Sequence, residues 1–350
     1  MTSLRPVRGT PYEVLAALRA WEAAEGEPKP LVIETSGSTG KPKRVVLSRR
    51  AMRASARATE ARLGGPGQWL LNLPAPYVAG VQVLFRSVLA DTTPVFLDEH
   101  EDFAAATAAM DSGRRYVSLV PTQLTRMLTS PRDVQALRTF DAVLVGGAAV
   151  EHSLRRAAAE AGVRVVATYG MSETCGGCVY DGVPLDGVAV AIGRDDTVRI
   201  TGPVLFDGYD GQPGDTAEVM QGEWFLTSDL GRLDDDGRLH VLGRVDDVIV
   251  SGGVNVPASA VARRLREHPW VAAAEVVGAP DPEWGRRVVA VVVSQGRARD
   301  LVALDDLRNW VSQVLPREWA PKRLVRAREI PLLPNGKVDR LALERMVADA

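Results

Sequence analysis

The sequence predicts an α/β fold with two domains: a large N-terminal domain with a parallel sheet covered by helices plus a small β unit, and a smaller α+β C-terminal domain. Three observations predict it. Apolar runs alternate with helical stretches over about residues 69–168, Gly- and Asp-rich turns separate short strands over about 187–245, and a second mixed module follows. The length of 350 residues fits two domains of about 100–200 residues each.

The alternating region predicts five strands with helices between them. Because these strands are almost continuously apolar, we expect both of their faces to be buried, as in a parallel sheet. The predicted strands are residues 69–73, 94–97, 116–120, 142–145 and 164–168, and the predicted helices are residues 80–90, 102–111, 121–129 and 151–161.

The remaining chain predicts a small antiparallel unit and then the C-terminal domain, with domains 1–245 and 246–350. The unit has strands at residues 188–192, 198–201, 224–227 and 239–242. The C-terminal domain has strands at 248–250, 271–277, 288–293 and 324–330, and helices at 257–268, 304–315 and 340–348. In the helix 304–315, the stripe Leu304, Leu307, Val311 and Val314 predicts a face packed on the sheet.

The composition excludes several classes of protein. Lys plus Arg number 42 and Asp plus Glu 44, so the net charge of −2 argues against a chain that coats nucleic acid or an anionic membrane. Two Cys exclude a disulfide-stapled secreted scaffold and favour the cytoplasm. The longest apolar run, Val288–Val293, is far shorter than the roughly 20 residues of a membrane span.

A segment rich in Ser, Thr and Gly follows the predicted strand 31–34. Its glycines allow close backbone approach, and its hydroxyls, N–H groups and lysines suit phosphate oxygens. The spacing is not that of the common nucleotide P-loop, and the apolar residues 44–47 predict that the loop joins two strands. A flexible Ser/Gly turn is the alternative. The candidate phosphate ligands are Thr35, Ser36, Gly37, Ser38, Thr39, Gly40 and Lys41.

Candidate ligand-binding residues also follow two neighbouring predicted strands. In open α/β sheets, ligands bind at the carboxyl ends of the strands. There, Tyr169 suits stacking on a base, Ser172 suits a phosphate, and Glu173 suits Mg²⁺. An ordinary turn is the alternative for the glycines. The small residues at these strand ends are Gly146, Gly147, Ala148 and Gly170.

Three more polar residues lie on short strands or turns further along. Asp229 and Arg244, on successive strands, suit the two hydroxyls of a ribose, and Lys337 lies in a Pro/Asn/Gly turn, where a solvated lysine is the alternative. Cys175 and Cys178 form a C-x-x-C, but a zinc site needs two more ligands, and none of the four His is paired at short spacing. Small residues that line a pocket are the favoured interpretation.

In this order, the segments resemble those of the adenylate-forming superfamily of acyl- and aryl-CoA ligases, over about residues 31–340. The resemblance implies that the loop 35–43 cradles the phosphates of ATP, that Tyr169 lies beside the adenine, and that Gly146, Gly147, Ala148 and Gly170 belong to the same site. It implies that Ser172 touches the α-phosphate and that Glu173 holds Mg²⁺.

The resemblance also assigns roles in the C-terminal half. Asp229 and Arg244 match the ribose ligands, and Asp246 matches the hinge about which a mobile C-terminal domain swings. Lys337 matches the lysine that bridges the substrate carboxylate and the α-phosphate. The pair Gly252 and Gly253 would lie beside the tunnel for the pantetheine of CoA.

The sequence departs from the superfamily at two points. Members are usually longer, and the first motif begins near residue 35, so we expect a shortened N-terminal domain. In the segment 73–80, Tyr77 stands where the family has a conspicuous His, which puts the steering role of that His in doubt.

The segments 73–80 and 170–182 resemble those of short o-succinylbenzoate–CoA ligases of menaquinone biosynthesis. This implies an acyl pocket with Tyr77, Gly80, Gly176 and Gly177, in which the last two leave room for an aromatic ring. Arg86 is a candidate partner for the free benzoate carboxylate.

We therefore expect an ATP-dependent, AMP-forming ligation of a carboxylic acid to CoA, with Mg²⁺ as cofactor and no nucleic-acid or membrane partner. Ligation of another aryl or acyl acid, or a non-catalytic nucleotide-binding relative, are the alternatives. A homo-oligomer is also left open by the sequence.

Overall fold

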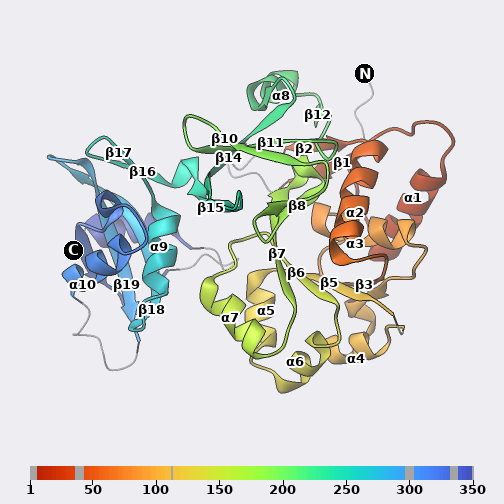
Figure 1. Ribbon diagram of the computed structural model, residues 1–350, viewed down its shortest axis with the longest axis horizontal. Coiled ribbons are helices and arrows are strands. Elements are labelled where there is room, and N and C mark those ends of the chain that lie inside the picture. Colours follow the sequence, from red (N-terminus) through yellow and green to blue (C-terminus); the bar gives the residue numbers. More distant parts are fainter. Residues whose placement is uncertain (1–5, 36–42, 112, 296–302, 332–337, 349–350) are drawn as a thin grey trace. The chain divides into compact units, whose positions relative to one another are not determined.

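The computed structural model describes residues 6–35, 43–111, 113–295, 303–331 and 338–348 (Figure 1). The chain divides into a larger unit, made of residues 1–191, 199–227 and 233–239, and a smaller unit, made of 192–198, 228–232 and 240–350. Each unit combines helices with sheets, so the predicted α/β class is confirmed. The predicted division into domains 1–245 and 246–350 stays a prediction.

The larger unit is built on a seven-stranded sheet of order β4-β3-β5-β6-β7-β8-β9. The pairs from β4 to β7 are parallel, as predicted, but β8 and β9 return antiparallel. In chain order the strands are β3 (Gln68–Leu71), β4 (Val95–Phe96), β5 (Arg115–Leu119), β6 (Ala142–Val145), β7 (Val165–Met171), β8 (Gly176–Tyr180) and β9 (Val183–Pro184).

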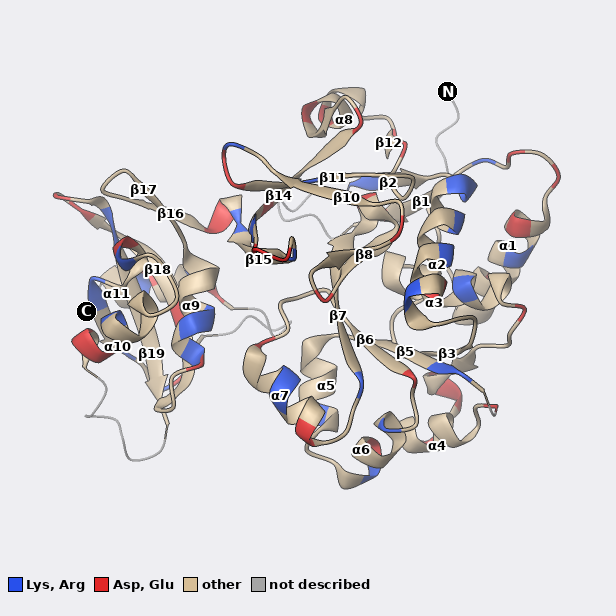
Figure 2. Ribbon diagram, in the orientation of Figure 1, with Lys and Arg blue, Asp and Glu red and all other residues tan. Residues whose placement is uncertain are grey.

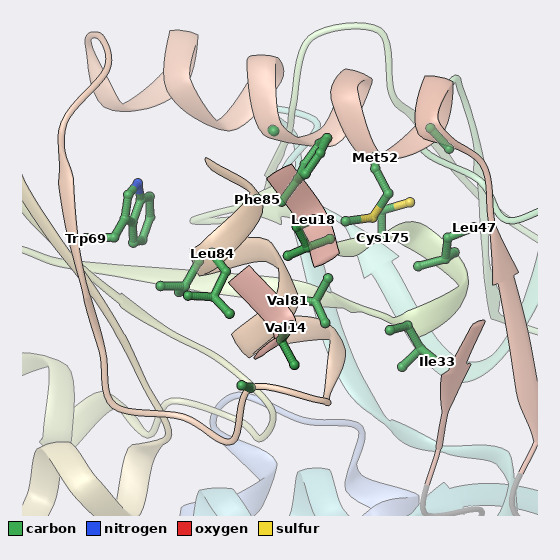
Figure 3. Packing of buried hydrophobic residues seen from close by; sticks show 14 of the residues in the cluster. Val14, Leu18, Ile33, Leu47, Met52, Trp69, Val81, Leu84, Phe85 and Cys175 are labelled. Carbon is green, nitrogen blue, oxygen red and sulfur yellow. The ribbon is translucent and has the colours of Figure 1, made fainter. Parts of the chain in front are cut away.

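Helices cover both faces of this sheet because successive strand residues point to opposite sides. Trp69 and Leu71 of β3 pack with α1–α3, whereas Leu70 packs in a second core with α4–α7 (Figures 1 and 3). The helices are α1 (Pro11–Ala23), α2 (Arg49–Leu63), α3 (Val78–Leu89), α4 (Phe103–Ala108), α5 (Pro121–Met127), α6 (Pro131–Leu137) and α7 (His152–Glu160), with a 3-10 turn η1 (Leu97–Glu99).

Two smaller sheets complete the strands before residue 245. β1 (Leu31–Glu34), β2 (Arg44–Leu47) and β12 (Gly208–Tyr209) form one, in which β2 is the central strand. The other has the order β10-β11-β14-β13, with β15 paired to β14. Its strands are β10 (Ala189–Ile192), β11 (Thr197–Thr201), β13 (Met220–Gln221), β14 (Trp224–Leu233) and β15 (Leu239–Arg244), and α8 (Pro213–Val219) precedes β13.

The smaller unit has a sheet of order β17-β16-β19-β18, with β20 beside β19. Leu307 and Val311 of α10 pack with α9 on one face, and Leu343 of α11 packs on the other. Val314 is 63% exposed because α10 ends at Ser312, so its predicted burial is wrong. The elements are β16 (Val248–Ser251), β17 (Val254–Pro257), α9 (Ala258–Arg266), β18 (Val271–Asp281), β19 (Gly285–Ser294), α10 (Leu304–Ser312), β20 (Arg323–Arg326) and α11 (Arg340–Ala348), with 3-10 turns η3 (Val245–Asp247) and η5 (Arg317–Trp319).

Local signals explain where the first helices begin. Thr10 and Glu13 form a capping box at α1, and the Ser48 hydroxyl accepts a hydrogen bond from Ala51 N at the start of α2. Basic and acidic residues are spread over the elements of each unit (Figure 2). Among the described residues, no helix has the length and apolar character needed to cross a bilayer.

Candidate active site

A cavity of about 270 Å³ lies in the larger unit, at the carboxyl ends of β5, β6 and β7. This edge of an open α/β sheet is where ligands bind, and the volume lies just below the range of about 300–1,000 Å³ common for small-molecule pockets. The predicted site residues on its wall are Tyr77, Gly80, Arg86, Gly146, Gly147, Gly170, Gly176 and Gly177. The structure therefore brings together residues from four separate segments.

Two glycines of this wall are required by close approach of the backbone. A Cβ atom on Gly146 would lie 2.3 Å from the Thr168 hydroxyl oxygen of the neighbouring strand. Gly170 has φ +159 and pairs with Gly177 on β8, and a Cβ atom there would lie 2.1 Å from the carbonyl oxygen of Gly176. The end of β6 and the hairpin β7–β8 are thus packed too tightly for side chains at these two points, and the glycines add no bulk to the cavity wall.

Arg86 is the charged residue of the cavity wall, and only 8% of it is exposed. Its Nη2 donates a 3.1 Å hydrogen bond to Thr59 Oγ1, and its guanidinium lies 5.0 Å from the ring centroid of Trp69. Burial lowers the pKa of Arg86, which Tyr180 opposes, but an arginine stays charged in proteins. Among the described residues, Nε has no hydrogen-bond partner and no carboxylate pairs with this charge.

Gln82 also lies on the cavity wall, and sequence reasoning did not single it out. Its Nε2 donates a 2.8 Å hydrogen bond to the carbonyl oxygen of Cys175, which also accepts a bond from the Ser55 hydroxyl. These bonds hold Cys175 at φ +53, directly before Gly176. Gln82 therefore fixes the start of β8. The sequence could have indicated Gln82, because it lies one helical turn before Arg86 on the same face of α3.

Glu173 lies in the 3-10 turn η2 (Ser172–Thr174), which links β7 to β8. Its Oε1 accepts a 2.9 Å hydrogen bond from the hydroxyl of Tyr209, a residue that the sequence analysis missed. Burial and the Glu173 carboxylate raise the pKa of Tyr209, so the phenol stays a donor.

The donor set at Glu173 fits Mg²⁺. No group of three or more His, Cys, Asp or Glu ligands is present in the part of the chain that the structure describes. Mg²⁺ is usually bound by one or two carboxylates together with substrate phosphates, so a single carboxylate is compatible with it.

The Ser/Gly loop begins and ends at residues whose main chains are joined. Thr35 N donates a 2.9 Å hydrogen bond to the carbonyl oxygen of Lys43, and β1 pairs antiparallel with β2 on either side. This confirms that the loop joins two strands. The candidate ligands Ser36 to Lys41 lie outside the described residues. Tyr169 is half-buried on β7, and Ala148 is exposed after β6.

In the smaller unit, Asp229 and Arg244 lie together on the paired strands β14 and β15. The Arg244 guanidinium lies 3.6 Å from the Asp229 carboxylate and 3.3 Å from that of Asp246. Gly252 and Gly253 form the turn between β16 and β17, with φ +58 and +80. The predicted catalytic residue Lys337 lies outside the described residues.

The two cysteines are buried free thiols in the larger unit. Cys175 packs in the apolar cluster with Met52 (Figure 3), and burial raises its pKa and raises that of Cys178 to about 12. The cavity wall includes Gly176 and Gly177, which lie between the two cysteines, but neither thiol. The expectation of small residues that line a pocket therefore holds for Gly176 and Gly177 and is wrong for the cysteines.

Comparisons with known proteins agree with this geometry. The model of the AMP-binding enzyme family matches residues 26–209, and that of the AMP-binding enzyme C-terminal domain matches residues 261–337. The chain is 44% identical to a probable 2-succinylbenzoate–CoA ligase from Mycobacterium tuberculosis, over 96% of this chain and 88% of that protein.

Solved structures show the same likeness. One is the o-succinylbenzoate CoA synthetase from Bacillus subtilis in complex with the acyl-adenylate intermediate, with a TM-score of 0.73 and 28% identity over 91% of this chain and 69% of that one. Another is the amide bond synthetase from Marinactinospora thermotolerans, with a TM-score of 0.76 and 30% identity over 91% of this chain and 68% of that one.

Proposed function

Because the chain belongs to the AMP-binding enzyme family, we propose that it ligates 2-succinylbenzoate to CoA, with ATP cleaved to AMP and pyrophosphate. The relatives from Mycobacterium tuberculosis and Bacillus subtilis support this substrate. Free, buried cysteines support a cytoplasmic location, since thiols persist in reducing compartments.

The observation that carries the substrate assignment is the buried charge of Arg86 on a cavity wall whose other residues are uncharged. 2-Succinylbenzoate has two carboxylates, of which only the one on the succinyl chain is ligated. The benzoate carboxylate stays ionised and needs a partner when the ring leaves water. A buried guanidinium without a described carboxylate partner suits it, since arginine pairs with carboxylates in a planar, two-bond geometry.

The proposed reaction has two steps and needs no side-chain nucleophile. An oxygen of the succinyl carboxylate attacks the α-phosphorus of ATP, and the bond to pyrophosphate breaks. The thiol sulfur of CoA then attacks the acyl carbon, the bond to the AMP oxygen breaks, and the thiol proton is released to solvent.

The residues of this chain hold the reactants. Glu173 would hold Mg²⁺, which offsets negative charge on the phosphate oxygens when bound. Asp229 and Arg244 are proposed to hold the ribose, Gly252 and Gly253 to line the path of pantetheine, and Lys337 to bridge the carboxylate and the α-phosphate. These last three roles rest on the family resemblance.

Product analysis by mass spectrometry tests the proposal. The purified protein, given 2-succinylbenzoate, ATP, Mg²⁺ and CoA, should form the CoA thioester, AMP and pyrophosphate in equal amounts. The matched control is the analogue that lacks the ring carboxylate, whose kcat/KM should be about a hundredfold lower, the worth of a charged hydrogen-bonded pair. Equal turnover of both acids would contradict the substrate assignment.

The role of Lys337 has a separate test. Lys337→Ala should abolish carboxylate-dependent exchange of pyrophosphate into ATP, yet leave thioester formation from supplied acyl-adenylate largely intact. Exchange that survives the substitution would refute this role.

Ligation to another acceptor is a second candidate, because the likeness to an amide bond synthetase is of similar strength. Both activities share the adenylate, and they differ in the group that attacks it. Replacing CoA with a panel of primary amines in the same assay separates them. Amide formation at rates above thioester formation would favour the second candidate.

A further inference from the structure

Tyr209 has a fixed position next to the candidate nucleotide site of the larger unit. It is the second residue of β12, pairs with Val45 of β2, and is 6% exposed. Its N–H donates a 2.9 Å hydrogen bond to Thr216 Oγ1, and its ring packs edge-on against Phe206 at 5.0 Å between centroids. The main chain and the ring are therefore both held in place by contacts outside the site.

The hydroxyl of Tyr209 contacts Glu173. The phenol donates to Oε1 at 2.9 Å, and three residues earlier Phe206 N donates to the main-chain carbonyl of Glu173 at 2.9 Å. One short segment thus holds both the backbone and the carboxylate of this residue. Because this hydrogen bond holds Oε1, the second carboxylate oxygen of Glu173 has acceptor positions left for another ligand.

The ring of Tyr209 contacts Lys43. The Lys43 ammonium lies 4.6 Å from the ring centroid, within the range of a cation–π interaction. Lys43 is the last residue of the Ser/Gly segment, and its carbonyl closes that loop against Thr35. Tyr209 is therefore in contact with two residues that are 130 positions apart in the sequence (173 − 43) and that both belong to the candidate phosphate and Mg²⁺ site.

We propose that Tyr209 is a positioning residue of the nucleotide site. Its hydroxyl orients the Glu173 carboxylate for the Mg²⁺ of bound ATP, and its ring orients the Lys43 ammonium for the phosphates. The proposal rests on the proposed function, in which Glu173 holds Mg²⁺. Outer partners of this kind fix the geometry of a metal ligand, and their loss typically weakens metal affinity by about 10–100-fold.

Two substitutions separate the two contacts. Tyr209→Phe removes the hydroxyl and keeps the ring, so the Mg²⁺ concentration that half-saturates ATP binding, measured by calorimetry, should rise about tenfold. ATP binding in EDTA should stay unchanged. Tyr209→Leu also removes the ring, so ATP binding in EDTA should weaken about threefold relative to the wild type, the worth of a weak cation–π contact.

The matched control is Tyr116→Phe. Tyr116 is a buried tyrosine whose hydroxyl donates to the carbonyls of Leu63 and Gly65, away from the nucleotide site. It should change stability and leave the Mg²⁺ dependence unchanged. A double variant completes the test: adding Tyr209→Phe to Glu173→Gln should raise the half-saturating Mg²⁺ concentration little further, because both changes act on the same ligand.

The outcomes distinguish this proposal from the proposed function. Wild-type ATP binding with a Mg²⁺ dependence that Tyr209→Phe does not alter would overturn the positioning role alone. Additive effects of Tyr209→Phe and Glu173→Gln would overturn it as well. A wild-type protein that binds no ATP at any Mg²⁺ concentration would overturn both. If Tyr209→Leu does not fold, the phenylalanine variant and the double variant still decide the question.

Discussion

Arg49 and Arg86 are both buried in the larger unit, 7% and 8% exposed, but their guanidinium groups have different surroundings. Arg49 is the first residue of α2, and its guanidinium reaches the end of α1, where it donates to the carbonyls of Trp21 (3.3 Å), Glu22 (3.1 Å), Ala24 (2.8 Å) and Gly26. The last carbonyls of a helix have no partner within it, so this arginine completes the fold. Arg86 donates to the Thr59 hydroxyl, interacts with Tyr180, and faces a cavity.

The different hydrogen-bond partners of Arg49 and Arg86 indicate different roles for the two guanidinium groups. A buried cation without an anion destabilises the folded protein, so it persists where a ligand supplies the partner. Burial alone would assign both arginines to the core. The partners, rather than the exposure, separate a structural arginine from one that we propose to bind substrate.

The largest expected effect is on folding at Arg49. Arg49→Met should lower the free energy of unfolding by about 3–4 kcal/mol, since several carbonyls lose a charged donor. Urea denaturation measures this, and kcat/KM per folded molecule should be unchanged. Arg53→Met is the control: that side chain forms a 2.6 Å ion pair with Glu22 and is 36% exposed, so the loss should stay below about 1 kcal/mol. Equal losses in both variants would break the comparison.

The next effect is on substrate use at Arg86. Arg86→Met should lower kcat/KM for 2-succinylbenzoate about a hundredfold, or about 2.7 kcal/mol, and leave the free energy of unfolding unchanged or higher. The analogue without the ring carboxylate should be used as well by the variant as by the wild type. A variant with a lower free energy of unfolding that still prefers 2-succinylbenzoate over the analogue would contradict the proposed difference between Arg86 and Arg49.

A smaller effect is expected when the charge is kept and its shape is changed. Arg86→Lys should lower kcat/KM for 2-succinylbenzoate only about tenfold, because an ammonium pairs with the carboxylate but lacks the planar two-bond geometry. Steady-state kinetics on the same two acids measure it. A lysine variant as active as the wild type would mean that charge alone, without geometry, is used.

The last expected effect concerns buried groups that are neutral, and its size for a single thiol matches that of Arg86→Lys. Burial raises the pKa of Cys178 to about 12 and also raises that of Cys175, while an exposed thiol ionises at about 8.5. Ionisation therefore favours the unfolded chain, and stability is lost as the pH rises above the unfolded value. By pH ~9.5 we expect a loss of about 1.4 kcal/mol for each thiol, measured by urea denaturation. The double variant Cys175→Ala, Cys178→Ala should not show this decline.

The pattern of apolar residues correctly predicted elements that are buried throughout or along one regular face. The predicted strand 142–145 coincides with β6, all of whose residues are buried, and the predicted helix 340–348 coincides with α11. Short or Gly-rich elements were missed. In α6 only Ala136 and Leu137 are buried, so no period is visible, and β8 starts with two glycines after a turn without the usual hairpin residues.

The sequence indicated which residue types line the candidate site, but it did not indicate the hydrogen bonds that hold them. The glycines at the ends of β6 and β7 were visible as a pattern. Tyr209 and Gln82 were not, because their partners Glu173 and Cys175 are 36 and 93 residues away in the sequence. Hydrogen bonds over such separations depend on the tertiary packing of separate elements, which local sequence patterns do not contain.

The three-residue turn between β7 and β8 connects the proposed Mg²⁺ ligand to the wall of the cavity. Glu173 lies within that turn, and Gly176 and Gly177 on the cavity wall follow after a single residue. Under the proposed function, a change that widens this wall for a bulkier acid would therefore also shift the Glu173 carboxylate, the proposed ligand of Mg²⁺. If the range of substrates changes during evolution, we therefore expect replacements on α3 or at Tyr77, which directly precedes α3, more often than replacements in the hairpin.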